Sequence, residues 1–418
     1  NAHIHLPPNF SAFETVEQAV GLAAEQELAV LGVSNYYDYD VYGTFATLAG
    51  RAHIFPLFGI EIIAMVEPLA KAGVKLNDPA NPGKMYICGK GITRFGLMTP
   101  RATELLALIR RNDSTRMAGM VKKLADVFAS RGLPTDLDEE AVKQMIVRRH
   151  GCPPATVYLQ ERHAAQAFQE AAFARVPESQ RAEALAKVLG VAPAAVKLEP
   201  VKVQNEIRSH LMKVGKPAYV EETFVSFEQA IELILELGGI PAYPVVADGA
   251  KPISAFEGPV QTMIENLRAR DIHGAEFIPP RNSPEVLDEY VPAMRSAGLF
   301  VTGGTEHNTL DVLPMQPACA GGKPVSEHVK RILWEGACVV AAHQFLTLHG
   351  RCGFVDAKGR PNPAYKSSEE RIAAFARLGG AVIHKYRGQP GSADVPSAAQ
   401  RAGRSRSRAG IARSEPLA

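Results

Sequence analysis

NAHIHLPPNFSAFETVEQAVGLAAEQELAVLGVS, residues 1–34, is the stretch that decides the fold. Its first five residues, 1–5, are short and mostly apolar, as in a buried strand. Residues 14–28 then place apolar side chains at helical spacing. Residues 29–34 form a second apolar run, which is typical of a strand covered on both faces. The stretch therefore predicts a strand, a helix and a second strand, in that order.

The same alternation of strands and helices continues along the chain, with an interruption in its middle. Near-continuous apolar strands separated by helices favour a parallel sheet with both faces covered. By analogy with eight-fold barrels, we expect an α/β fold, a distorted (β/α)7 TIM-like barrel with a helical insertion. The strands that continue the pattern are predicted at 53–63, 85–91, 240–246, 274–280 and 299–309.

The interruption divides the chain into four predicted parts. Residues 1–94 form the first part of the barrel, and residues 95–220 form a helical insertion or lid. Residues 221–387 form the second part of the barrel with C-terminal helices. Residues 388–418 are rich in Gly, Pro, Ser, Arg and Ala and are expected to be a disordered tail.

The composition restricts the class of protein. With 46% hydrophobic and 22% charged residues among 418, the chain is typical of a soluble globular protein. The net charge of +2 does not indicate nucleic acid, and the absence of a long apolar run predicts no membrane span. The 5 cysteines contain no CxxC pair, so we expect free thiols and a cytoplasmic protein. The chain begins without Met and inside a predicted strand, so we expect residues to precede it.

Histidines and carboxylates fall at the predicted strand ends, where barrels of this kind place their active sites. His3 and His5 are two residues apart on a strand, so their side chains point the same way. Such a pair alone is weak evidence for a metal site, because a structural or surface role is the more common explanation. Glu61 and Glu306 also follow predicted strands, and two imidazoles with two carboxylates suit Zn, Mn or Fe.

Five motifs in a fixed order resemble those of the PHP (polymerase and histidinol phosphatase) superfamily. This superfamily comprises metal-dependent phosphoesterases on a distorted (β/α)7 barrel, often with three metal ions. The resemblance covers residues 1–90 and 220–310. The motifs are HIH (3–5), VSNYYD (33–38), FGIE (58–61), GGIPAYP (238–244) and TGGTEHNT (302–309).

The resemblance implies that only one of the family's metal positions is retained. The four ligands of that position correspond to His3, His5, Glu61 and Glu306. At the other two positions, the ligands that are not shared are replaced, by Tyr86 or Cys88, Tyr243, Phe10, Tyr36 and Asn308. We therefore expect one divalent metal ion per chain.

A phosphoesterase with one ion needs cations from the protein to bind the substrate anion. Lys90, Arg162 and Arg281 are the candidates, and the alternative for each is a solvated surface cation. Arg162 and His163 belong to ERHAAQAF, which is similar to a family segment facing the active site, although the Arg-to-His spacing differs.

Three further side chains have two interpretations each. His307 is next to a proposed ligand, so it is a candidate general base or substitute ligand, unless it points away from the metal. Tyr36 and Tyr243 are candidate hydrogen-bond donors to substrate or residues that fill the core.

The sequence thus predicts a cytoplasmic PHP-like metal-dependent hydrolase that uses one ion on a small phosphorylated substrate. The helical insertion would cover the mouth of the site. Two alternatives remain open: a mononuclear C–N hydrolase of amidohydrolase type, and a non-catalytic binding protein with a PHP fold.

Overall fold

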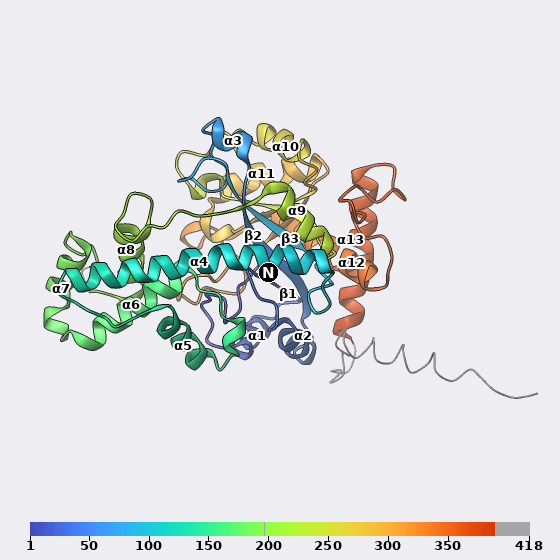
Figure 1. Cartoon of the computed structure of the whole chain (residues 1–418). Helices are drawn as coiled ribbons and strands as arrows, with labels where there is room; N and C mark the ends of the chain where they lie inside the picture. Colours follow the sequence, from blue (N-terminus) through green and yellow to red (C-terminus); the bar gives the residue numbers. More distant parts are fainter. Residues whose placement is uncertain (196, 389–418) are drawn as a thin grey trace, which may run out of the picture.

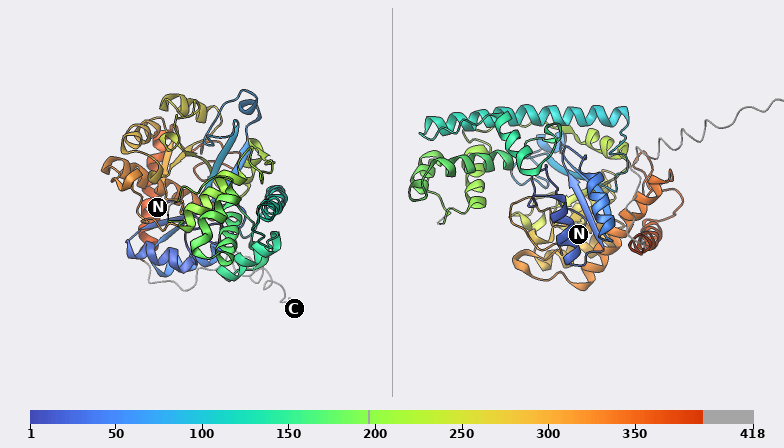
Figure 2. Two further views of the ribbon diagram at one scale, coloured as in Figure 1. Left: turned by 90° about the vertical axis from the view of Figure 1, so that its left-hand side faces the viewer. Right: turned by 90° about the horizontal axis from the view of Figure 1, so that it is seen from below.

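The computed structural model describes residues 1–195 and 197–388 of the chain. One curled β-sheet is surrounded by helices, and further helices extend from it on one side (Figure 1, Figure 2). This arrangement confirms the predicted α/β class. The predicted tail, 388–418, lies outside the described residues from residue 389 onward.

Seven strands form the sheet within the described residues, and six of them follow the order β1-β2-β3-β5-β6-β7. Each of these six overlaps one of the predicted strands. The pairs β1–β2, β5–β6 and β6–β7 are parallel. The strands are β1 (Val30–Asn35), β2 (Phe55–Met65), β3 (Lys84–Lys90), β5 (Ile240–Val245), β6 (Gly274–Phe277), β7 (Phe300–Gly303) and the short β4 (Val225–Ser226), which pairs with β2.

The expectation of a parallel sheet is wrong for β3, which runs antiparallel to both β2 and β5. Apolar runs report burial on both faces of a strand, but they carry no information on its direction. A parallel neighbour also needs a crossover connection, usually through a helix that packs on the sheet. Between β2 and β3 the chain offers only the five-residue α3 (Glu67–Lys71).

Residues 1–5 lie between β1 and the end of β7 and hydrogen-bond to both. The Ile4 N–H donates to the Gly32 carbonyl at 2.9 Å, and the His5 N–H donates to the Glu306 carbonyl at 2.8 Å. Ile4 forms a single parallel bridge to each side instead of the predicted full strand. Through this segment, the two edges of the curled sheet are connected.

Two glycines allow the segment to lie so close to its neighbours. A Cβ atom at Gly32 would clash with the Ala2 carbonyl, and one at Gly304 would clash with the backbone and Cβ of His3. Both contacts require a residue without a side chain. The position of His3 is therefore fixed by backbone packing on two sides.

Helices cover the sheet and bury its apolar side chains in a common core. α9 is typical, because its buried Phe227, Ala230, Leu233 and Ile234 form one stripe along the helix. The helices that cover the sheet are α1 (Val16–Glu25), α2 (Tyr42–Arg51), α9 (Phe227–Glu236), α10 (Val260–Arg268), α11 (Pro284–Ser296), α12 (Glu327–Leu348) and α13 (Ser368–Arg387). None of the helices among the described residues is long and apolar enough to cross a membrane.

The middle of the chain is helical and has an apolar core of its own. Phe128 and Phe168 are fully buried in this second core, with ring centroids 5.0 Å apart. The first half of α4 instead packs on the sheet side, where Leu105 and Leu106 join the main core. The helices of this segment are α4 (Pro100–Ser130), α5 (Glu139–His150), α6 (Glu161–Arg175), α7 (Arg181–Leu189) and α8 (Pro200–Ile207).

Candidate metal centre and its cavity

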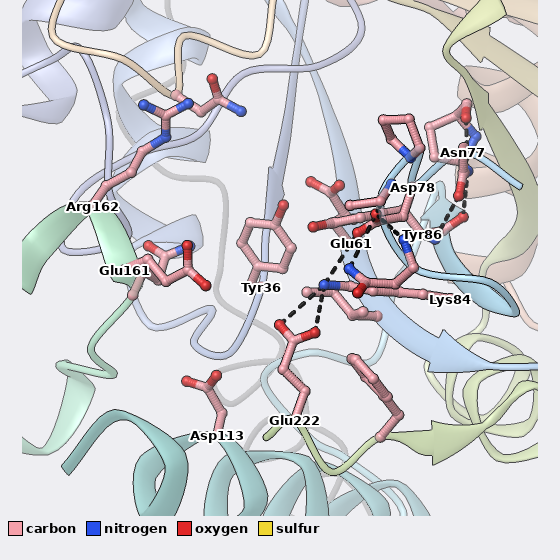
Figure 3. A pocket seen from close by; sticks show the side chains of 18 of the residues that line it. Tyr36, Glu61, Asn77, Asp78, Lys84, Tyr86, Asp113, Glu161, Arg162 and Glu222 are labelled. Atoms are coloured by element: carbon pink, nitrogen blue, oxygen red, sulfur yellow. Dashed lines mark hydrogen bonds and ion pairs between the residues drawn. The ribbon is translucent and has the colours of Figure 1, made fainter. Parts of the chain in front are cut away.

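A cavity of about 690 Å³ lies where the helical segment meets the sheet. Tyr36 follows β1, Glu61 lies in β2, and Arg281 and Glu306 follow β6 and β7, so the sheet forms one wall. Figure 3 shows Arg162, from the first turn of α6, on the side opposite the strand residues. The cavity therefore lies at the strand ends, where the sequence predicts the site.

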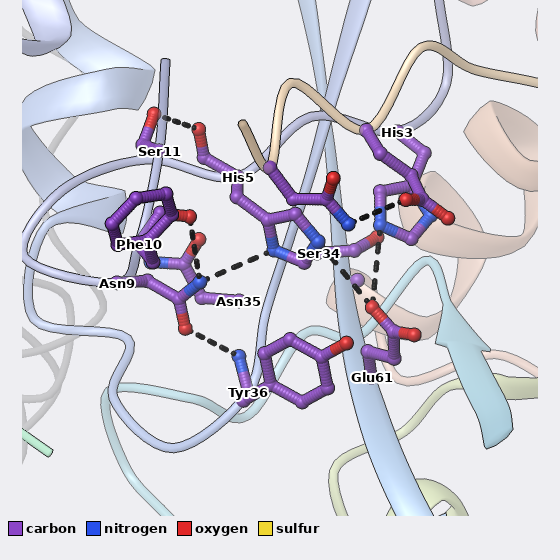
Figure 4. A network of polar contacts seen from close by, with 12 residues as sticks. His3, His5, Asn9, Phe10, Ser11, Ser34, Asn35, Tyr36 and Glu61 are labelled. Carbon is purple, nitrogen blue, oxygen red and sulfur yellow. Dashed lines mark hydrogen bonds and ion pairs between the residues drawn. The ribbon is translucent and has the colours of Figure 1, made fainter. Parts of the chain in front are cut away.

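His3, His5 and Glu61 come together beside this cavity (Figure 4). The Nε2 atoms of His3 and His5 lie 3.6 and 3.4 Å from Oε2 of Glu61. All three atoms are buried, and none has a hydrogen-bond partner. Because an unpaired buried polar atom is costly, three such atoms facing one point are typical of an ion-binding site.

The protonation of the group also suits a metal ion. Burial lowers the pKa of His5, which favours the neutral imidazole that metals bind. Burial raises the pKa of Glu61, but the neighbouring His5 and His3 lower it more, and the net pKa lies below its usual value. Two imidazoles and one carboxylate are a donor set found in zinc sites that keep an open position.

The Nδ1 atom of each imidazole, on the side of the ring away from Glu61, has a polar partner. His3 Nδ1 lies 2.6 Å from Oε2 of Glu276. His5 Nδ1 lies 3.3 Å from the amide nitrogen of Asn9, and the ring stacks on Tyr36 at 5.2 Å between centroids. These contacts fix the rings in the orientation that faces Glu61.

The fourth predicted ligand, Glu306, has other partners in this structure. Its carboxylate pairs with Arg281 and accepts a hydrogen bond from the Asn308 amide at 2.6 Å. It is not among the atoms that lie within 4.8 Å of one another in the His3–His5–Glu61 group. Glu306 has φ 59° and His307 has φ 50°, and such left-handed conformations are strained in non-glycine residues.

Three residues predicted as catalytic do not line the cavity. His307 Nδ1 contacts Thr305 Oγ1 at 2.6 Å, and its Nε2 contacts the Leu313 carbonyl at 3.0 Å, so both ring nitrogens are engaged. Lys90 is buried in an ion pair, and Tyr243 is buried against Phe256. These positions do not fit a direct contact with substrate.

Two predicted cations do line the cavity, Arg162 and Arg281. Arg281 is paired with Glu306, whereas Arg162 has no hydrogen bond or ion pair with any residue in the described part of the chain. Burial and the nearby Arg208 and Arg281 lower the pKa of Arg162 to about 10, so it stays positively charged at neutral pH. An unpaired guanidinium at this position can bind an anion.

His163, the neighbour of Arg162, has a structural position. Its Nδ1 accepts a hydrogen bond from the Gln160 N–H at 3.1 Å, which caps the first turn of α6. Burial lowers the pKa of His163 to about 3, so the ring is neutral. Arg162, in the same first turn, lines the cavity.

Charged residues that the sequence analysis did not single out connect the helical segment to the sheet. Lys84 in β3 pairs with Glu222 at 2.7 Å, and Arg116 of α4 pairs with both Glu222, at 3.3 Å, and Glu161. Lys213 pairs with Glu161 at 2.6 Å. These residues are far apart in the chain and form no motif, so no sequence signal could have grouped them.

No family model and no curated protein matches the chain. Solved structures with a similar fold include two hydrolases. An amidohydrolase from Chromobacterium violaceum, with bound sulfate and no metal, has a TM-score of 0.50 and 17% identity over 79% of this chain and 96% of that one. A proposed metal-dependent phosphoesterase from Bifidobacterium adolescentis has a TM-score of 0.51 and 15% identity over 80% of this chain and 95% of that one. At these identities the likeness concerns the fold, which is one that such hydrolases use.

Proposed function

We propose that the chain is a PHP-like metal-dependent hydrolase that cleaves phosphate esters with a single divalent ion. The observation that carries the proposal is the convergence of three buried, unpartnered donor atoms beside the cavity. The connection of both sheet edges through residues 1–5 supports a distorted (β/α)7 barrel as the architecture. A cytoplasmic location remains part of the proposal.

His3, His5 and Glu61 would hold the ion, and Zn fits two nitrogens and one oxygen well. A divalent ion there supplies a Lewis acid that polarises a substrate oxygen. Tyr36 lines the cavity, and burial raises its pKa, so its hydroxyl stays protonated and can donate a hydrogen bond to substrate.

Arg162 and Arg281 would bind the substrate anion. Arg162 is already free, and Arg281 holds Glu306, whose carboxylate mimics an anionic ligand. A phosphate that takes over Arg281 would release Glu306, and Glu306 could then complete the predicted ligand set. The sulfate bound in the Chromobacterium violaceum neighbour supports an anion site in this fold.

The second candidate is a C–N hydrolase of amidohydrolase type, favoured by the description of the same neighbour. One ion suffices for that chemistry too. A binding protein without activity is the remaining alternative, and it predicts binding of anions without turnover.

Elemental analysis of the purified protein after metal loading tests the proposal. We expect about one ion per chain, and a large loss in His5→Ala, which removes one of only three buried donors. His328→Ala is the matched control, because His328 is exposed on α12. Less than about a tenth of an ion per wild-type chain would overturn the proposal.

Turnover of p-nitrophenyl phosphate against a panel of amides then separates the enzyme classes. Phosphatase activity that is lost with the metal in His5→Ala supports the phosphoesterase. Amide hydrolysis alone selects the second candidate, and phosphate binding without turnover of either class selects the binding protein.

A further inference from the structure

Two groups of potential metal ligands share His3. The first is His3, His5 and Glu61, and the second is His3, Cys88 and Glu276. In each group the ligand atoms lie within 4.8 Å of one another, and all the residues are buried. Cys88 is directly opposite Glu61 in the β2–β3 pairing, so the groups are adjacent.

The two groups differ in how their atoms are partnered. In the first, the three facing atoms are unpaired. In the second, Glu276 is fully engaged: its Oε1 accepts from the Thr302 hydroxyl at 3.1 Å, and its Oε2 lies 2.6 Å from both His3 Nδ1 and Lys90 Nζ.

The ammonium of Lys90 has a complete set of partners in this place. Besides Glu276, it donates to the Ala2 carbonyl and the Ser34 hydroxyl, each at 3.3 Å. An ammonium has three N–H donors, and three acceptors surround this one. Lys90 and Glu276 are 3% and 0% exposed, so this ion pair is buried away from solvent.

We infer that Lys90 is a built-in cation that occupies the second ligand group and limits the centre to one metal ion. The inference rests on the proposed function, because it concerns the same site. The positive charge of Lys90 neutralises Glu276, and it would repel a second ion placed between Cys88 and Glu276. Without Lys90, the Glu276 carboxylate, the Cys88 thiol and His3 could bind a second cation, which would release the thiol proton and the Nδ1 proton of His3 to solvent.

The same ion pair makes Glu276 a positioning residue for His3. An ionised carboxylate only accepts hydrogen bonds, so His3 must carry its proton on Nδ1. Its Nε2 then keeps the lone pair that faces Glu61. A carboxylate behind a metal-binding histidine commonly strengthens metal binding by 10-fold to 100-fold.

Metal stoichiometry of Lys90→Met tests the inference. We expect about one ion in the wild type and about two in the variant. With cobalt, the second ion should add a thiolate-to-metal charge-transfer band, which Lys90→Met with Cys88→Ser should lack. Lys84→Met is the matched control, since Lys84 is also a buried lysine in an ion pair, with Glu222, and it should keep one ion.

Glu276→Gln provides a second measurement if Lys90→Met does not fold. It should weaken binding of the first ion by about 10-fold to 100-fold, measured by competition with a chromogenic chelator. One ion with wild-type affinity in both variants would overturn this inference but not the proposed function. Two ions and a thiolate band in the wild type would do the same. A wild type that binds no ion would overturn the proposed function as well.

Discussion

Arg162 is a cation at the cavity wall whose countercharge no described residue supplies. Removing a guanidinium from water is costly unless it is paired. This unpaired guanidinium lies at the start of α6, and Glu306 and Arg281 line the same cavity. The arrangement is suited to an anion that arrives from solution and binds between the two arginines.

Arg162→Met should therefore weaken binding of inorganic phosphate by about 10-fold to 100-fold, the usual loss for a hydrogen bond to a charged group. Metal content should not change, because Arg162 is not a ligand. Calorimetric titration with phosphate measures the effect. Arg175→Met, at an exposed ion pair with Asp136, is the control and should bind phosphate like the wild type. Equal affinity in both variants would exclude Arg162 from the anion site.

At the scale of elements, the backbone of α12 packs so closely on β7 that only glycine fits at the point of contact. A Cβ atom at Gly336 would clash with the Val301 carbonyl, so the helix contacts the strand through its backbone. This contact brings α12 against the strand that leads into Glu306 and His307.

Gly336→Ala should lower the free energy of unfolding by about 1–3 kcal/mol, because the methyl group must push α12 away from β7. Gly21→Ala in α1 is the matched control: nothing lies within 4 Å of its added Cβ atom. That variant should gain about 0.5–1 kcal/mol from the better helix propensity of Ala. Urea unfolding measures both. A Gly336→Ala protein as stable as Gly21→Ala would show that this close contact does not form.

The elements also show what the sequence can and cannot predict. Apolar runs located all six strands of the main path, because burial on both faces leaves a clear pattern. The amino-acid sequence has no comparable pattern that shows the antiparallel direction of β3. At the site, the spacing of His3 and His5 predicted that both side chains point the same way, and the structure places both beside Glu61. The partners of Lys90 and Glu306 depend on which residues of distant strands become neighbours, and local patterns do not contain that information.

At the scale of the whole molecule, two apolar cores meet across a layer of charged residues. Glu161 is central to this layer, with Arg116 and Lys213 as partners. Burial raises the pKa of Glu161, but Lys213 and Arg116 lower it more, to about 2. Since its folded-state pKa lies below the unfolded value, Glu161 stabilises the fold above about pH 4.5, and this contribution is lost as the pH falls toward 2.

Glu161→Gln should remove this contribution, which is on the order of 3 kcal/mol at pH 7 and smaller at pH 3. Urea unfolding of both proteins at the two pH values measures the difference. Glu183→Gln, at the exposed pair with Lys187, should change stability little at either pH. A Glu161→Gln deficit that is the same at pH 3 and pH 7 would contradict the assigned role.

α4 begins on the sheet side and ends in the second core, and it is 31 residues long. At 1.5 Å per residue it spans about 46 Å, and it has no proline after its first turn. Its two halves therefore pack in different apolar cores, and one continuous helix connects the cores. Pulling the two cores apart must strip one half of α4 from its apolar neighbours, so mechanical separation should occur as one abrupt event rather than by gradual bending.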